Sequence, residues 1–216
     1  MLKAILFDLD GTLLDTIADI DAALNRTLGT SFTPEECKRF VGNGLMNALK
    51  TALEKAGRTD ASAPELFARF VENYRQHPVE HTKPYPGIME LLGMMQRRGI
   101  GLGVYSNKEQ DLAGEIVARC LPGVRFDMVV GMHGGYEPKP SSQAVVAFCA
   151  KVGCSMNELL YVGDSEVDYR TGLNAGVRTV ILTWGMRPRA ELEASGIPKA
   201  ILVDDMDGLE RCIEGF

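Results

Sequence analysis

Short runs of hydrophobic residues recur along the chain, and each run ends in small or acidic residues before a helical pattern begins. Runs that are apolar at nearly every position are typical of strands buried on both faces. The helical segments between them suit the right-handed crossovers of a parallel sheet. The pattern therefore predicts a doubly wound parallel α/β fold. The expected strands are residues 3–7, 101–105, 128–130, 159–162 and 179–182, with a weaker strand at 200–203.

The spacing of these runs is interrupted once, between the first and second strands. Residues 15–83 contain no convincing buried strand. They contain helix-like stretches at 17–28, 34–40, 45–56 and 63–75. One crossover of a parallel sheet needs far less chain, so we expect this segment to form a separate helical cap. Residues 1–14 and 84–216 would then form the α/β core. We also expect a turn at 84–87 and an Asp15 side chain that caps the first inserted helix.

The composition is that of an ordinary globular protein, because 45% of the 216 residues are hydrophobic and 24% are charged. The five cysteines are scattered, and the apolar stretch at the amino terminus is too short for a signal peptide or a membrane span. We therefore expect a cytoplasmic protein with reduced thiols and no membrane partner. We take a monomer or a homodimer as its oligomeric state, which these features do not determine. The formal net charge of -6 disfavours nucleic acid as a partner.

Chemically reactive side chains follow four of the expected strands, at the points where these strands end. Along the chain they are Asp8, Asp10, Ser106, Asn107, Lys139 and Asp164. Because ligands of parallel sheets bind outside the carboxyl ends of the strands, we expect these side chains to converge. Carboxylates crowded in this way repel one another unless a cation lies among them. Carboxylate oxygens are ligands that Mg²⁺ prefers, so Asp8 and Asp164 are its expected side-chain ligands.

The same side chains suit the transfer of a phosphoryl group. An aspartate such as Asp8 can attack phosphorus, and a second aspartate, Asp10, can protonate the leaving group and later activate water. Ser106, the backbone amide of Asn107 and Lys139 are placed to stabilise the phosphoryl oxygens. Ser106 and Asn107 have an alternative interpretation as the start of the following helix. The two interpretations are compatible, because helix amino termini also attract phosphate.

Four motifs in this order resemble those of the haloacid dehalogenase superfamily, and the resemblance covers essentially the whole chain. The motifs are DLDGT at 8–12, Ser106 after a hydrophobic strand, Lys139, and GDSEVD at 163–168. The third motif departs from the family's frequent Lys-Pro-x-Pro, because a serine replaces the second proline. The inserted helices resemble the C1 cap of the family, a lid that closes over the substrate.

The resemblance implies a role for each motif residue. Asp8 would be the nucleophile and a magnesium ligand, and Asp10 would be the acid/base residue whose backbone carbonyl also binds the metal. Asp164 would be the third protein ligand. Other residues would bind the phosphoryl group or support the site without binding the metal directly. Ser106 and Asn107 would bind phosphate, Lys139 would neutralise Asp8 and the phosphoryl group, and Thr12 and Asp168 would support them.

Details of the motifs favour a phosphatase within this superfamily. Asp10 is present, and the cap turn formed by Gly42, Asn43 and Gly44 offers no lysine for a Schiff base of the phosphonoacetaldehyde hydrolase type. That turn is the expected substrate loop. The Val-Gly-Asn-Gly sequence at 41–44 and the Ser-Asn-Lys sequence at 106–108 resemble phosphoglycolate phosphatases most. That resemblance implies Mg²⁺-dependent hydrolysis of a small phosphorylated metabolite. A phosphomutase of the β-phosphoglucomutase type and a pyrophosphatase remain alternatives, and the intact motifs disfavour a non-enzymatic binding protein.

Overall fold

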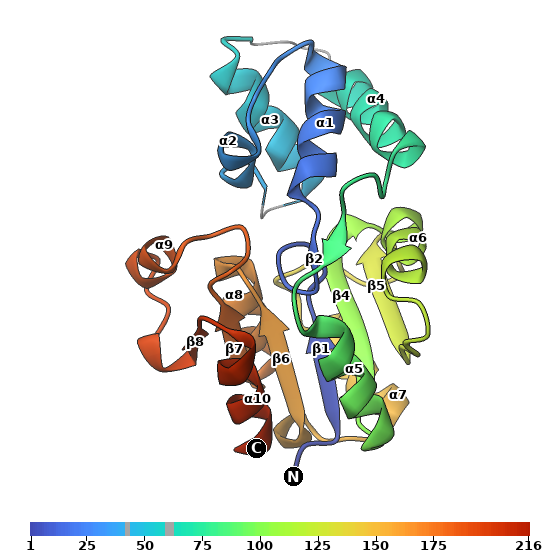
Figure 1. The fold of residues 1–216 in the computed structure, drawn as a ribbon, viewed down its shortest axis with the longest axis vertical. Coiled ribbons are helices and arrows are strands. Elements are labelled where there is room, and N and C mark those ends of the chain that lie inside the picture. The colour runs from blue at the N-terminus through green and yellow to red at the C-terminus, as the bar shows by residue number, and fades with distance from the viewer. Residues whose placement is uncertain (42–43, 59–62) are drawn as a thin grey trace.

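The structure is a computed structural model that describes residues 1–41, 44–58 and 63–216, and it places a parallel sheet below a group of helices (Figure 1). The strands of this sheet are β1 (Ala4–Phe7), β4 (Gly101–Glu109), β5 (Met128–Met132), β6 (Leu159–Gly163), β7 (Arg178–Leu182) and β8 (Leu202–Val203). Their order is β5-β4-β1-β6-β7-β8, and all neighbours are parallel. The predicted doubly wound α/β fold is confirmed.

Strand β1 lies between β4 and β6, and all four of its side chains are buried. Its alternate residues enter two different hydrophobic clusters. Ile5 and Phe7 belong to one cluster, whereas Ala4 and Leu6 belong to the other. Because the strand has no exposed face, its sequence is apolar at every position and shows no alternation.

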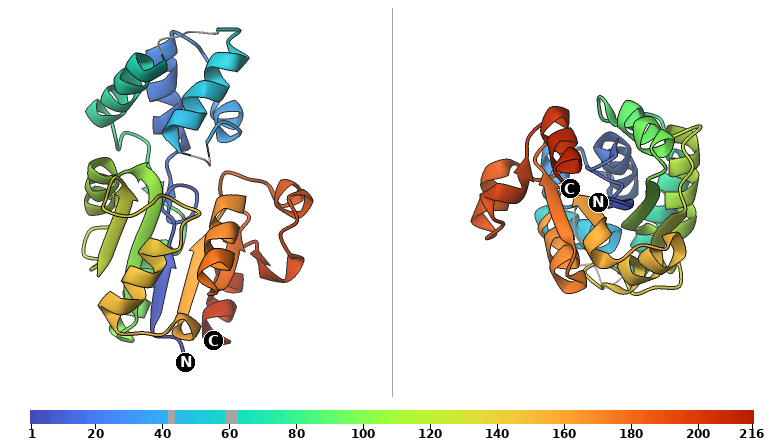
Figure 2. Two further views of the ribbon diagram at one scale, coloured as in Figure 1. Left: turned by 180° about the vertical axis from the view of Figure 1, so that it is seen from behind. Right: turned by 90° about the horizontal axis from the view of Figure 1, so that it is seen from below.

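Helices cover both faces of the sheet (Figure 2). On the face formed by Ile5 and Phe7 lie α5 (Ile88–Arg97), α6 (Gln110–Cys120) and α10 (Met206–Glu214). On the face formed by Ala4 and Leu6 lie α7 (Gln143–Val152) and α8 (Glu166–Ala175). The remaining core elements are helix α9 (Arg189–Ala194) and the 3₁₀ turns Met156–Glu158 and Lys199–Ile201.

Strand β4 is longer than the sequence pattern predicts. The expected end at residue 105 is wrong, since the strand continues to Glu109 with a shift in its pairing to β5 after Tyr105. The alternative placement of Ser106 and Asn107 at the start of a helix is also wrong, because α6 begins at Gln110. The last residues of β4 are polar because they face the candidate site rather than the core. The apolar run therefore ends before the strand does.

The inserted helices lie together at the carboxyl-terminal edge of the sheet (Figure 1). They are α1 (Ile17–Leu28), α2 (Pro34–Lys38), α3 (Leu45–Lys55) and α4 (Ala63–Gln76). Two short strands that were not predicted, β2 (Leu14–Asp15) and β3 (Lys83–Pro84), pair antiparallel where the chain enters and leaves this group. The predicted capping role of Asp15 is wrong, because Asp15 belongs to β2 and Thr16 occupies the cap position of α1.

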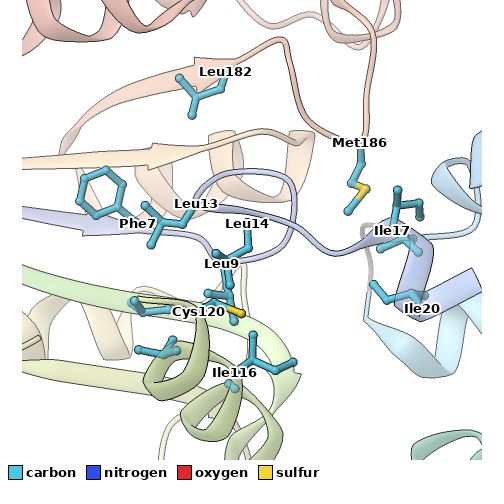
Figure 3. Packing of buried hydrophobic residues seen from close by; sticks show 14 of the residues in the cluster. Phe7, Leu9, Leu13, Leu14, Ile17, Ile20, Ile116, Cys120, Leu182 and Met186 are labelled. Atoms are coloured by element: carbon cyan, nitrogen blue, oxygen red, sulfur yellow. The ribbon is translucent and has the colours of Figure 1, made fainter. Parts of the chain in front are cut away.

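One hydrophobic cluster runs from the sheet into the inserted helices (Figure 3). Leu9 and Leu13 lie beyond the end of β1, and Met186 of the core reaches toward Ile17 and Ile20 of α1. Shared apolar burial therefore stabilises the inserted helices against the core. Within the residues that the structure describes, none of the helices is both long and apolar enough to cross a membrane.

Candidate active site

The predicted reactive side chains come together at the carboxyl ends of β1, β4 and β6. They line one cavity, and from the core they are Asp8, Asp10, Ser106, Asn107, Lys139 and Asp164. Val41, Gly44 and Leu45 of the inserted segment also line it, so the cavity lies between the core and the inserted helices. Its volume of about 40 Å³ is room for roughly three water molecules.

Lys139 lies between two buried aspartates. Its Nζ atom is 2.8 Å from Oδ1 of Asp8 and 2.8 Å from Oδ1 of Asp168. Asp168 also accepts hydrogen bonds from the hydroxyl of Tyr161 and from the backbone N–H and hydroxyl of Ser165. These contacts hold the Asp168 carboxylate in place, and Asp168 in turn holds the Lys139 ammonium against Asp8.

Asp164 is held by contacts that leave its carboxylate at the base of the cavity. The hydroxyl of Thr12 lies 3.3 Å from Oδ1, and the backbone N–H of Met186 donates to Oδ2 over 2.7 Å. A Cβ atom on Gly11 or on Gly185 would lie only 2.3 Å from Oδ2. Gly11 also has a φ of +84°, which favours glycine. The two glycines therefore make the room that the Asp164 carboxylate occupies.

Burial and mutual repulsion disfavour the charged forms of these aspartates. Burial raises the pKa of Asp8 from 3.8 to about 7. Burial and the neighbouring Asp8 and Asp168 carboxylates raise the pKa of Asp164 well above its usual range. One oxygen from each of these three side chains lies within 4.8 Å of the others. Asp168 is bound by Tyr161 and Ser165 as well as Lys139. Asp8 and Asp164 line the cavity, so they are the members that offer ligands. This crowded set of hard oxygen donors fits Mg²⁺.

The side chain of Asn107 fixes the backbone of Lys139 rather than pointing freely into the cavity. Its Oδ1 accepts a hydrogen bond from the Lys139 N–H over 2.8 Å, and its Nδ2 donates to the Lys139 carbonyl over 3.1 Å. Ser106, which is 2% exposed, accepts a hydrogen bond from the backbone N–H of Lys108. The side chain of Asn107 therefore has a structural role that the sequence did not indicate. Phosphate binding by its backbone amide stays a prediction.

Lys108 is a residue of the site to which the sequence analysis assigned no role, although it follows Ser106 and Asn107 directly. It is buried, and its Nζ atom lies 2.8 Å from Oδ1 of Asp10. Burial alone would lower the pKa of Lys108, but the neighbouring Asp10 carboxylate raises this pKa above its usual value. Lys108 follows Ser106 by two residues on β4, so a longer predicted strand would have placed both on one face. That spacing is the signal by which Lys108 could have been found.

The predicted substrate loop is only partly within the described residues. Gly42 and Asn43 lie outside them, whereas Gly44 precedes α3 with a φ of +84° and lies near the backbone of Asn107. The guanidinium of Arg187 in the core donates hydrogen bonds to the carbonyls of Lys38 and Val41. Arg187 therefore ties the segment before this loop to the core.

Comparison with known proteins gives the family of this chain. Residues 5–182 match the sequence profile of the haloacid dehalogenase-like hydrolases. The chain belongs to this family. The resemblance that the four motifs indicated is thereby confirmed.

Similarity to individual hydrolases extends over most of the chain. A phosphoglycolate phosphatase of Aquifex aeolicus is 34% identical over 85% of this chain and 86% of its own length. A phosphoglycolate phosphatase of Cereibacter sphaeroides is also 34% identical, over 91% of this chain and 93% of its own. The solved structure of a candidate phosphoglycolate phosphatase from Lactobacillus delbrueckii subsp. bulgaricus superimposes with a TM-score of 0.90 at 30% identity, covering 98% of both chains. This haloacid dehalogenase-like hydrolase thus shares both its sheet and its inserted helices with that structure.

Proposed function

We propose that this hydrolase is an Mg²⁺-dependent phosphatase of small phosphomonoesters, with phosphoglycolate as its leading substrate. The observation that carries the proposal is the buried Asp8 carboxylate, 2.8 Å from Lys139 and grouped with Asp164 in a small cavity. The names of the similar proteins support phosphoglycolate in particular.

In the first step of the proposed reaction, a carboxylate oxygen of Asp8 attacks the phosphorus atom. The bond between phosphorus and the ester oxygen breaks, and Asp10 gives its proton to the departing oxygen. The product alcohol leaves, and the phosphoryl group remains on Asp8 as an aspartyl phosphate. Lys139 and Ser106 stabilise the negative charge on the phosphoryl oxygens during this step.

In the second step, Asp10 takes a proton from a water molecule, and the resulting hydroxide attacks phosphorus. The bond between phosphorus and Asp8 breaks, which releases inorganic phosphate and restores the free carboxylate. Asp10 therefore acts first as an acid and then as a base, and its proton balance closes over the two steps. Lys139, held by Asp168, stays next to Asp8 throughout.

The residues proposed to hold Mg²⁺ are Asp8, Asp164 and the backbone carbonyl of Asp10. When bound, the ion neutralises charge on the phosphoryl oxygens and on the crowded carboxylates. Thr12 and the backbone N–H of Met186 orient Asp164 toward this position. The carboxylate of Asp10 is held separately by Lys108 and is kept for proton transfer.

We also propose that residues 15–83 form a cap domain over the core, with Gly42, Asn43 and Gly44 as its substrate loop. Val41, Gly44 and Leu45 line the same cavity as Asp8, which supports this role for the cap. The paired strands β2 and β3 hold the two crossings between cap and core side by side. Substrate selection would then depend on which side chains the cap brings to the cavity.

A substrate panel tests this function. We expect phosphate release from phosphoglycolate with Mg²⁺ and almost none with excess EDTA. The variant Asp8→Asn should abolish turnover while its circular dichroism spectrum stays unchanged. The matched control is Asp15→Asn, which alters a nearby carboxylate outside the cavity and should keep wild-type turnover. Near-normal activity of Asp8→Asn would show that the nucleophile is wrong. Faster turnover of pyrophosphate, or isomerisation of a sugar phosphate without phosphate release, would replace the proposed activity by one of the alternatives.

A further inference from the structure

Lys108 is a buried cation whose hydrogen bonds join the core to the inserted helices. Its side chain has 0% exposed surface. Its Nζ atom lies 2.8 Å and 3.0 Å from the two carboxylate oxygens of Asp10, and it donates to the hydroxyl of Tyr74 over 3.0 Å. An ammonium group has three N–H donors, so these contacts occupy it fully.

Tyr74 belongs to α4 (Ala63–Gln76), so the Lys108 Nζ atom contacts an inserted helix as well as Asp10 of the core. The side chain of Tyr74 is fully buried, and the Lys108 Nζ atom lies 4.5 Å from the centre of its ring. The ring face attracts the ammonium as well, which adds to the hydrogen bond. Because Tyr74 is carried by an inserted helix, this contact exists only while that helix is seated on the core.

Asp10 depends on Lys108 for its orientation. In the described part of the chain, the hydrogen bonds recorded for the Asp10 carboxylate come from Lys108. The Asp10 side chain is 15% exposed toward the cavity, so packing alone leaves it room to turn. A proton donor must lie within hydrogen-bond reach of the departing oxygen, and a displacement of about 1 Å can slow a reaction about 100-fold.

We propose that Lys108 is a positioning residue for Asp10, and that Tyr74 makes this positioning depend on the seating of the cap. The inference rests on the proposed phosphatase function. With α4 seated, Tyr74 fixes Lys108, and Lys108 turns the Asp10 carboxylate toward the leaving oxygen. With α4 lifted, Lys108 loses one of its two partners and Asp10 loses its fixed orientation. Proton transfer to the leaving group is thus confined to the closed enzyme.

Two small substrates with different leaving groups separate positioning of the proton donor from other effects. Phosphoglycolate releases an alcohol, whose oxygen needs a proton as its bond to phosphorus breaks. Acetyl phosphate is of similar size, but it releases acetate, which departs as a stable anion and needs no proton. The ratio kcat/KM covers the steps up to this first departure. A defect confined to Asp10 positioning therefore lowers kcat/KM for phosphoglycolate and spares acetyl phosphate.

The decisive variants are Lys108→Met and Tyr74→Phe. For phosphoglycolate, we expect kcat/KM to fall about 100-fold in Lys108→Met and about tenfold in Tyr74→Phe. For acetyl phosphate, we expect a fall of less than about threefold in both, since no proton transfer is lost. Tyr74→Phe removes only a hydroxyl and retains the ring, so it carries the test if Lys108→Met does not fold.

The matched control is Arg75→Gln. Arg75 follows Tyr74 on α4, and its Nη2 atom lies 2.8 Å from Oε2 of Glu109, the residue after Lys108 on β4. This neighbouring ion pair joins the same two elements but is partly exposed and does not reach Asp10. We expect both substrates to react within about twofold of the wild-type rate, because surface ion pairs contribute little.

Several outcomes would overturn the inference. One is an equal loss on both substrates, which would assign Lys108 to folding or phosphate binding. Others are an unchanged or faster reaction of phosphoglycolate in Lys108→Met, and an equal loss in Arg75→Gln and Tyr74→Phe. The variant Asp10→Asn is the reference, and it must lower kcat/KM for phosphoglycolate while sparing acetyl phosphate. If Asp10→Asn shows this selective loss but the Lys108 and Tyr74 variants do not, only this inference fails. If the wild-type enzyme hydrolyses neither substrate, the proposed function fails together with it.

Discussion

The buried Asp8 carboxylate makes the stability of the metal-free protein depend on pH. Burial raises its pKa from 3.8 to about 7, so the folded protein holds this proton more tightly than the unfolded chain does. The folded state is therefore penalised as pH rises from about 4 to about 7, where Asp8 must ionise without a bound cation. The variant Asp8→Asn removes this titration and keeps the shape of the side chain.

The magnitude follows from the same pKa. One pKa unit corresponds to about 1.4 kcal/mol, so the rise from 3.8 to about 7 corresponds to at most about 4 kcal/mol. Below pH 4 the carboxyl is protonated in both states and contributes nothing to the difference. Relative to Asp8→Asn, the wild-type protein should therefore lose up to about 4 kcal/mol of unfolding free energy between pH 4 and pH 8. Lys139 stays charged over this range. Burial lowers its pKa, but the neighbouring Asp168 and Asp8 carboxylates raise the pKa by more.

Urea unfolding in EDTA, at several pH values between 4 and 8, measures this difference for the two proteins side by side. The control is Asp15→Asn, which removes one carboxylate outside the cavity and so accounts for the general effect of losing a carboxylate. Saturating Mg²⁺ should remove most of the trend, because a bound cation favours ionised Asp8. A difference between wild type and Asp8→Asn that stays constant across this range would refute the argument that burial penalises the Asp8 carboxylate.

Two further predictions concern the metal and the cap. Mg²⁺ at about 100 times its dissociation constant should stabilise the wild-type protein by about 2.7 kcal/mol, or a rise in Tm of about 5–10 °C, whereas Asp164→Asn should show little rise. Differential scanning fluorimetry checks this, and an equal rise in both proteins would place the ion elsewhere. Arg187→Met should raise KM for the substrate several-fold with a smaller change in kcat, because it frees the segment held at Lys38 and Val41. Steady-state kinetics of Arg187→Met measure both constants. An unchanged KM would show that Arg187 does not help to seat the cap.

Much of the fold was predictable because burial on both sides of a sheet leaves a direct trace in the sequence. The apolar run at β1 could be placed for this reason, as could the helical character of the inserted segment. The end of β4 could not, because its last residues face a polar site and their polarity resembles that of a loop. The pairing of β2 with β3 was also invisible, since it joins two-residue segments far apart in the chain.

The candidate site was predictable where residues sit at fixed places after a strand. Asp8, Asp10 and Asp164 follow apolar runs directly, so the topology alone brings them to one edge. Lys108 was missed for a physical reason, because a lysine is ordinarily solvated and its burial requires partners from other parts of the chain. Those partners, Asp10 and Tyr74, become neighbours only when the inserted helices fold onto the sheet.

Lys108 also changes the charge balance of the site. When all four are ionised, the carboxylates of Asp8, Asp10, Asp164 and Asp168 exceed the two ammonium groups of Lys108 and Lys139 by two negative charges. Lys108 balances Asp10, and Lys139 is shared between Asp8 and Asp168, so the surplus lies on the group that includes Asp8 and Asp164. A divalent cation would balance that surplus at the position where phosphate has to bind. A chain with a formal net charge of -6 can therefore accept an anionic substrate, because the local charge that this substrate meets differs from the charge of the whole protein.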